Sequence, residues 1–139
     1  MHKKHQPVTQ VHLINFVQFT EPHSILSIFP SGDQVPFSIK RVFTVDAYQP
    51  CLRGAHAHKE CTQLMIALRG VCTVTCDDGK EKKEYVLKSP AQGLLVPATI
   101  WAEQSYEKET LLMVLTDQLY DPADYIRDYK EFLQFRNSL

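Results

Sequence analysis

The stretch "VCTVTCDDGKEKKEYVL", from Val71 to Leu87, has the sequence pattern of a β-hairpin. Its first half alternates apolar and small polar side chains, as expected of a strand with one buried face. The "DDG" that follows favours a tight turn, because Asp and Gly adopt the backbone angles that such turns need. "KEYVL" would then run back antiparallel. We therefore predict a hairpin, with Cys72 and Cys76 on one face of its first strand.

Similar short runs continue in both directions from this hairpin. They are rich in Val, Ile, Leu, Phe and Thr, which favour strands, and they read "VHLINFVQF", "SILSIF", "FSIKRVFTV", "TQLMIAL", "GLLVP" and "TLLMVLT". Turn sequences separate several of them, as in "PSGD" (Pro30 to Asp33) and "SPAQG" (Ser89 to Gly93). Many short strands within 139 residues predict one all-β domain, a sandwich or barrel spanning residues 1–139.

The end of the chain changes to a helical period. In "DPADYIRDYKEFLQF", Asp121 can cap a helix and Pro122 suits its first position. The apolar side chains then recur at helical spacing, namely Tyr125, Ile126, Tyr129, Phe132 and Leu133. This predicts a short amphipathic C-terminal helix whose aromatic stripe packs on the sheet.

Composition narrows the class of protein. The formal net charge is −1, so no basic surplus is available for nucleic acid, and we expect no nucleic-acid partner. No apolar run is long enough for a signal peptide or a membrane span. We therefore expect a cytoplasmic protein without a membrane partner, in which residues 1–9 form a flexible tail. The cysteines at 51, 61, 72 and 76 are then expected to be free thiols.

Two histidines one residue apart stand out in "RGAHAHKECTQ", from Arg53 to Gln63. Residues two apart on a strand point to the same face, so His56 and His58 should project together. If that face lines the interior, both imidazoles share one cavity. Three interpretations remain open from these residues alone: a metal site, an acid-base site, or a solvated edge strand.

The spacing around the histidines resembles the first sequence motif of the cupins. His-x-His is followed after four residues by Gln63, and after six more by Gly70. This resemblance implies a jelly-roll barrel, also called a double-stranded β-helix. In the second cupin motif a third histidine is usual, but Ala102 stands in its place here. Two imidazoles and a neutral amide make a weak divalent-metal site, so we expect no metal and no other cofactor.

A closer resemblance is to the nucleotide-sugar 3,4-ketoisomerases of the cupin superfamily, over about Phe37 to Phe132. It rests on "PFSIKRVF" (Pro36 to Phe43), "RGAHAHK" (Arg53 to Lys59), Gln63, "SPAQGLLV" (Ser89 to Val96), Trp101 with Glu103, and "YDPADYIRDY" (Tyr120 to Tyr129). The resemblance implies an isomerase that moves the keto group of dTDP-4-keto-6-deoxyglucose from C4 to C3, through an enediol, in deoxysugar biosynthesis.

Carried over by position, His56 and His58 are the expected catalytic residues. We assign His56 as the carbon acid-base and His58 as its relay, although the opposite assignment is open. Histidine suits this work because its ordinary pKa lies near neutrality. The expected substrate-binding residues are Arg53, Gln63, Trp101 and Arg41. For Trp101 a place in the core is an equal alternative, and for Arg41 a solvated position on a strand is at least an equal one.

The chain departs from the family pattern in three places. Pro22 to Ile25 replace an early Arg-Gly turn, Phe43 and Thr44 stand where a tyrosine is common, and Ala102 replaces a histidine. These losses keep two other functions open. One is a non-catalytic cupin that binds a sugar or nucleotide sugar, and the other, less favoured, is a metal-dependent cupin enzyme.

The run "VHLINFVQF" near the N-terminus bears on assembly. An apolar strand left unpaired at a sheet edge is exposed to aggregation unless something covers it. Pairing with a twofold-related subunit would cover it. The resemblance implies the same arrangement, so we expect a homodimer with exchanged N-terminal strands.

Overall fold

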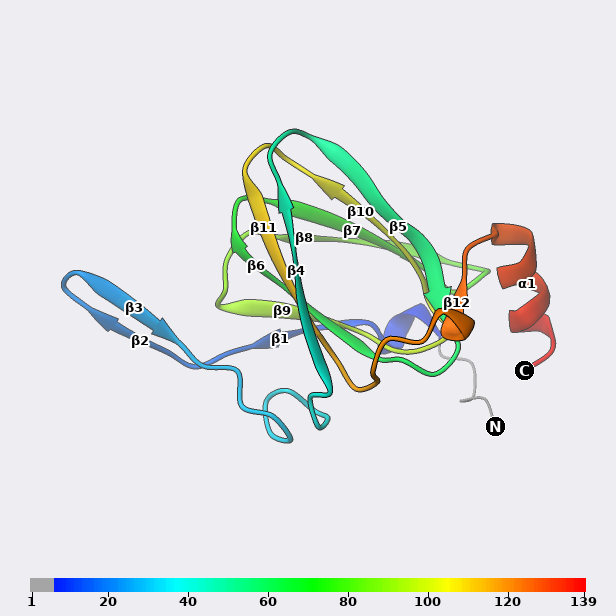
Figure 1. Cartoon of the computed structure of the whole chain (residues 1–139), viewed down its shortest axis with the longest axis horizontal. Helices are drawn as coiled ribbons and strands as arrows, with labels where there is room; N and C mark the ends of the chain where they lie inside the picture. The colour runs from blue at the N-terminus through cyan, green and yellow to red at the C-terminus, as the bar shows by residue number, and fades with distance from the viewer. Residues whose placement is uncertain (1–6) are drawn as a thin grey trace.

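The structure is a computed structural model that describes residues 7–139, and these residues fold into two facing antiparallel sheets and one short helix (Figure 1). The strands described are β1 His12–Asn15, β2 Gln18–Glu21, β3 Ser24–Ser27, β4 Arg41–Ala47, β5 Cys51–His58, β6 Gln63–Arg69, β7 Cys72–Asp77, β8 Lys82–Leu87, β9 Gln92–Val96, β10 Trp101–Tyr106, β11 Thr110–Thr116 and β12 Tyr125–Ile126. The helical segments are η1 Val8–Gln10, η2 Pro122–Asp124 and α1 Tyr129–Asn137.

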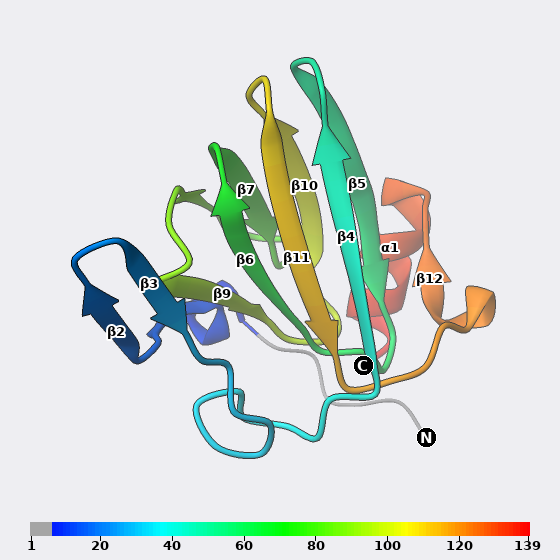
Figure 2. The ribbon, with the colours of Figure 1, turned by 60° about the vertical axis from the view of Figure 1, so that its left-hand side comes forward.

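The sheets lie face to face, as Figure 2 shows. One has the strand order β1-β9-β6-β11-β4 and the other β12-β5-β10-β7-β8, while β2 and β3 form a separate hairpin. The prediction of an all-β jelly-roll with a short C-terminal helix is confirmed. Among residues 7–139 the two sheets are not joined by backbone pairing into a closed barrel, so the interior is open at an edge.

The hairpin predicted from "VCTVTCDDGKEKKEYVL" is formed by β7 and β8, which pair from Cys72↔Leu87 to Asp77↔Lys82. Its turn is held by the Asp77 carboxylate, which accepts a hydrogen bond from the Gly79 N–H at 2.7 Å. Cys72 and Cys76 are fully buried between the sheets, on one face as predicted. The four cysteines are free thiols, also as predicted.

The prediction for the C-terminal segment was wrong in where the helix begins. Asp121 caps only the single turn η2, and α1 starts at Tyr129 with Asp128 as its cap, accepting from the Glu131 N–H at 3.2 Å. Between them, β12 pairs with the end of β5, Tyr125 opposite His58. The free edge of β5 offers these residues backbone partners that helical spacing cannot reveal. This short strand places Tyr125 beside the histidines.

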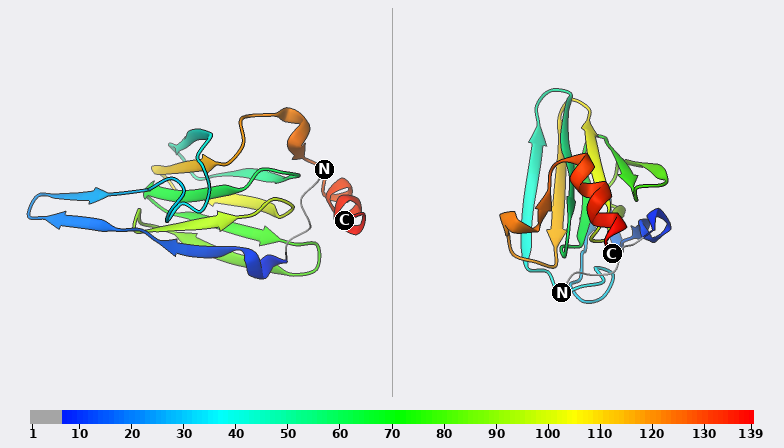
Figure 3. Two further views of the ribbon diagram at one scale, coloured as in Figure 1. Left: turned by 90° about the horizontal axis from the view of Figure 1, so that it is seen from below. Right: turned by 90° about the vertical axis from the view of Figure 1, so that its right-hand side faces the viewer.

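The N-terminal run also divides differently from the prediction. "VHLINFVQF" is split between β1, which pairs with β9, and β2, which pairs with β3. The β2–β3 hairpin extends beyond the sheets, at the opposite end from α1 (Figures 1 and 3). Its apolar side chains are exposed, with Phe19 at 54%, Ile25 at 61% and Leu26 at 59%.

The expected tail, residues 1–9, lies partly outside the described residues. Of the part that is described, Val8 is buried and its N–H donates to the Asp78 carboxylate at 2.7 Å. Among residues 7–139, no helix is long and apolar enough to cross a membrane.

Candidate active site

A cavity of about 250 Å³ lies between the sheets, lined by side chains of β4, β5, β6, β10, β11 and β12. Four of the six residues singled out from sequence line it, namely Arg41, Arg53, His56 and Gln63. His58 lies beside them, since its ring centre is 5.0 Å from that of His56 and the two rings are almost perpendicular. The expectation that both imidazoles project together therefore agrees with the geometry.

A β-bulge in β5 aims His56 into this cavity. The pairing with β10 runs Ala102↔His56 and then Glu103↔Gly54, so Ala55 is the extra residue. Gly54 and Ala55 both have positive φ, +84° and +56°. A glycine in the left-handed region is a feature of one class of bulge, whereas this conformation is uncommon for a non-glycine residue such as Ala55. A Cβ on Gly54 would lie 2.9 Å from Gln104 Oε1 and 3.0 Å from the Ala102 carbonyl oxygen. A side chain at residue 54 would therefore collide with β10, which explains the glycine of the Arg-Gly pair.

His56 is held in its neutral form. Its pKa falls from 6.5 to about 4, because burial disfavours the charged ring and the neighbouring His58 adds to this. Interaction with the Gly54 backbone offsets only part of the effect. The Nδ1 atom is buried and has no hydrogen-bond partner within residues 7–139. A neutral imidazole with an unengaged nitrogen can accept a proton from a ligand.

His58 is oriented by Asp124, a residue that the sequence did not single out. His58 Nδ1 donates to Asp124 Oδ2 at 2.9 Å. The same carboxylate accepts backbone N–H groups from Glu60 at 2.7 Å and Cys61 at 3.3 Å. Burial by itself would raise the pKa of Asp124, but the hydrogen bonds from His58 and these amides outweigh it and lower the pKa. The other ring nitrogen, His58 Nε2, is buried and has no hydrogen-bond partner within residues 7–139.

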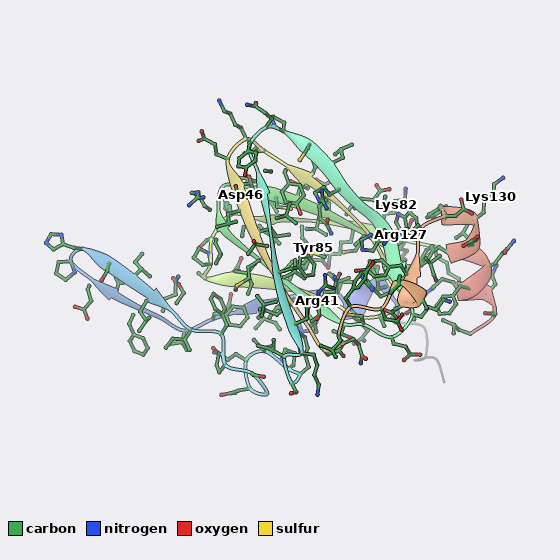
Figure 4. All side chains as sticks on the ribbon, viewed as in Figure 1. Arg41, Asp46, Lys82, Tyr85, Arg127 and Lys130 are labelled. Carbon is green, nitrogen blue, oxygen red and sulfur yellow. The ribbon has the colours of Figure 1, made fainter. Side chains whose placement is uncertain are left out.

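Aromatic and cationic side chains complete the mouth of the cavity. The Tyr125 ring centre lies 5.0 Å from that of His56 and 4.4 Å from that of His58. The Arg127 guanidinium stacks over Tyr125 at 4.4 Å, and that of Arg41 stacks over Phe43 at 4.6 Å. Figure 4 labels Arg41 on β4 and Arg127 just after β12. With Arg53, these two arginines give the cavity a positively charged rim that suits an anionic ligand.

Trp101 lies on the other face of β10 from the cavity. The inward side chains of β10 are Ala102, Gln104 and Tyr106, so alternation turns Trp101 outward under α1. There its ring contacts Tyr129 and Phe132, at centroid distances of 5.3 and 5.5 Å. Trp101 therefore does not line this cavity, and its position agrees with the alternative of a place in the core, while its role in substrate binding stays a prediction.

One group of side chains has the composition of a metal site. Ligand atoms of His58, Cys61 and Asp124 lie within 4.8 Å of one another. The Asp124 oxygens are already engaged by His58 and two backbone amides, so a metal would have to displace these hydrogen bonds. His56 and Gln63 do not belong to the group. Its donors fit a proton-relay network better than a metal centre.

The fold and the cavity define a small cupin-type protein with a buried histidine pair between two sheets. The chain belongs to the FdtA family (WxcM-like, C-terminal), which matches residues 9–137.

Similar proteins include both a curated relative and solved structures. The TDP-4-oxo-6-deoxy-alpha-D-glucose-3,4-oxoisomerase of Aneurinibacillus thermoaerophilus is 38% identical over 125 residues, which cover 88% of this chain and 90% of the relative. A 3,4-ketoisomerase from Helicobacter canadensis superposes with a TM-score of 0.88 at 33% identity, covering 91% of this chain and 97% of the other. QdtA from Thermoanaerobacterium thermosaccharolyticum, a 3,4-ketoisomerase, gives 0.86 at 28% identity and coverages of 92% and 94%. That structure is a histidine-to-asparagine variant in complex with TDP-4-keto-6-deoxyglucose.

Proposed function

We propose that this protein is a nucleotide-sugar 3,4-ketoisomerase, which moves the keto group of TDP-4-keto-6-deoxyglucose from C4 to C3 in deoxysugar biosynthesis. The observation that carries the proposal is the pairing of a neutral His56 with an Asp124-oriented His58 in one cavity. The proposal is also supported by a relative, since the chain is 38% identical to an oxoisomerase whose name states this substrate.

In the proposed mechanism one imidazole moves a proton between neighbouring carbons. His56 Nδ1 takes the proton from C3, and the electron pair of that C–H bond forms the enediol while the C4 carbonyl oxygen gains a proton. The C3 hydroxyl then loses its proton, C3 becomes a carbonyl, and a proton is delivered to C4. His58 carries protons on the oxygen side. The overall change is an isomerisation that consumes no oxidant.

The remaining cavity residues hold the substrate. Arg41, Arg53 and Arg127 offer guanidinium groups to the diphosphate, which they can bind with paired hydrogen bonds. Gln63 faces the same space and can hydrogen-bond sugar hydroxyls. The cavity lies just below the usual volume of about 300–1,000 Å³ for small-molecule sites. It therefore suits the hexose, with the nucleotide toward the rim.

The direct test is turnover in deuterium oxide, followed by NMR of the sugar. A ketoisomerase produces the 3-keto sugar with deuterium at C4, and it exchanges the C3 proton of the 4-keto sugar for deuterium.

The competing candidate is a cupin that binds the nucleotide sugar without turning it over. It is favoured by Ala102, a buried side chain without acid-base capacity that pairs directly with His56. Tight binding with unchanged, unlabelled sugar would establish that candidate.

Activity is expected to be independent of added metal. The reason is that the histidine pair lacks a third imidazole and a carboxylate in the cavity, and the Asp124 oxygens are engaged elsewhere. Protein dialysed against EDTA should retain its turnover within about twofold. Loss of activity on dialysis, restored by zinc, iron or manganese, would show that a metal takes part.

A homodimer with exchanged N-terminal strands is part of the proposal. The exposed apolar side chains of the β2–β3 hairpin support it, because a protruding hairpin is marginally stable without a partner surface. Wild-type protein is expected to sediment at twice the 16.0 kDa of one chain. Leu26→Asp on the hairpin should shift the protein to monomer at micromolar concentration.

The matched control for assembly is Val86→Asp on β8, since Val86 is similarly exposed at 51% but lies away from the hairpin. This variant should remain dimeric. A monomeric wild type would contradict the dimer, and a dimeric Leu26→Asp variant would remove the hairpin from the interface.

The proposal also covers domain, location and partners. Residues 1–139 are taken as a single domain whose ligand is the nucleotide sugar, with no nucleic acid or membrane partner. A net charge of −1 supports the absence of a nucleic-acid partner. Free thiols at all four cysteines are typical of a reducing compartment and support a cytoplasmic location.

A further inference from the structure

The phenol of Tyr106 lines the cavity but has no role in the mechanism described above. Tyr106 ends β10, on the same inward face as Ala102 and Gln104. It is only 2% exposed, and within residues 7–139 its hydroxyl has no hydrogen-bond partner. A hydroxyl buried in this way costs stability, and such a group in a native structure calls for an explanation.

The two histidines of the site also have buried polar atoms without hydrogen-bond partners. In the part of the chain that the structure describes, the buried side-chain nitrogen and oxygen atoms without partners are His56 Nδ1, His58 Nε2 and Tyr106 OH. The first two belong to the proposed proton-transfer pair, and Tyr106 lines the same cavity as His56. Burial raises the pKa of Tyr106, so its phenol stays protonated and able to donate. This unpartnered hydroxyl is available to a ligand.

The position of Arg53 indicates which part of the ligand lies there. Arg53 lines the cavity, pairs with Gln104 in register, and acts electrostatically on both His56 and Tyr106. Along β5, Arg53 lies between His56, which pairs with Ala102, and Cys51, which pairs with Tyr106. An arginine in that place suits the diphosphate, which is attached at C1 of the sugar. The C1–C2 side of the hexose would then face Tyr106.

The chemistry of the substrate leaves one hydroxyl for this contact. In 4-keto-6-deoxyglucose, C3 and C4 are the reacting carbons, C1 carries the diphosphate, C5 has no hydroxyl and C6 is a methyl group. We infer that Tyr106 hydrogen-bonds the C2 hydroxyl of the hexose and makes the enzyme selective for sugars that carry it. This inference rests on the proposed function, and it adds a specificity-determining residue to it.

The test compares Tyr106→Phe with a matched variant in the same core. Tyr85 on β8, labelled in Figure 4, is buried in the same cluster but does not line the cavity, and its hydroxyl donates to the Val11 carbonyl at 2.9 Å. Tyr106→Phe is expected to raise KM for TDP-4-keto-6-deoxyglucose about 3- to 10-fold, as for one lost hydrogen bond, with kcat within about twofold. Its thermal midpoint should be equal to or above wild type. Tyr85→Phe should lower the thermal midpoint and leave KM unchanged.

A substrate analogue lacking the C2 hydroxyl identifies the partner atom. Wild type and Tyr106→Phe are expected to show the same KM for the 2-deoxy analogue, because the hydrogen bond is absent in both cases. The inference is overturned if Tyr106→Phe leaves KM for the full substrate unchanged, or if its penalty persists with the analogue. Absence of wild-type turnover would overturn the proposed function instead, and this inference with it.

Discussion

Replacing His56 by asparagine is expected to lower kcat by roughly 10²–10⁴-fold, the usual loss when a general acid-base group is removed. Asparagine fills similar space and keeps a polar edge in the cavity, but it cannot carry a proton. Because His56 is neutral near pH 7, with its pKa lowered to about 4, the substitution removes no charge from the ligand site. Affinity for TDP should therefore stay within a few-fold.

The measurement is turnover by NMR together with calorimetric binding of TDP. His12→Asn is a suitable control, because His12 lies exposed on β1, outside the cavity. It should behave like wild type. Near-normal turnover in His56→Asn would remove His56 from the mechanism and make His58 the carbon base. Loss of TDP binding along with turnover would instead assign His56 to ligand binding.

Asp124→Asn is expected to lower kcat by roughly 10²–10⁴-fold with little change in KM, by analogy with the buried aspartate that orients a catalytic histidine in serine proteases. The carboxylate accepts the Nδ1 proton of His58 at 2.9 Å and two backbone amides. If the asparagine oxygen keeps the shorter hydrogen bond, the one from the Glu60 N–H to Oδ1, its NH₂ takes the place of Oδ2 and faces both His58 Nδ1 and the Cys61 N–H. Nδ1 would then have to accept, which moves the ring proton to Nε2.

The tautomer gives this prediction a readout that a merely structural role would not change. ¹⁵N NMR of the imidazole should show the His58 proton on Nδ1 in wild type and on Nε2 in Asp124→Asn. The control is Asp121→Asn, which alters the exposed cap of η2, where asparagine can still accept from the Ala123 N–H. Unchanged kcat in Asp124→Asn, with the tautomer shifted, would show that His58 orientation is not needed for turnover.

The sequence by itself determined the class of fold and the central pair of the site. Strand alternation placed Cys72 and Cys76 on one buried face, and "DDG" specified the hairpin turn, because both signals depend on neighbours in the chain. The same local period brought the rings of His56 and His58 to 5.0 Å. Their shared face follows from a spacing of two residues, and it required no knowledge of the rest of the molecule.

Only the tertiary structure decided what surrounds the pair. Asp124 lies 66 residues from His58 in the chain, and no local pattern predicts that a loop after β11 returns to the end of β5. The helical period around Tyr125 was misleading, because the free edge of β5 offered backbone partners that favour a strand. The position of Trp101 away from the cavity has the related reason that α1 covers the outer face of β10, a contact that no local pattern predicts.

The lowered pKa of His56 was likewise decided only by the tertiary structure, and so was the burial of the Tyr106 hydroxyl, which has no hydrogen-bond partner within residues 7–139. Burial is a property of the assembled core, set by both sheets at once, so residue type and spacing cannot give it. The sequence thus determined which groups able to move protons are present and that two of them share a face. The fold decided their protonation, their orientation by Asp124 and the shape of the cavity, because each depends on contacts between segments far apart in the chain.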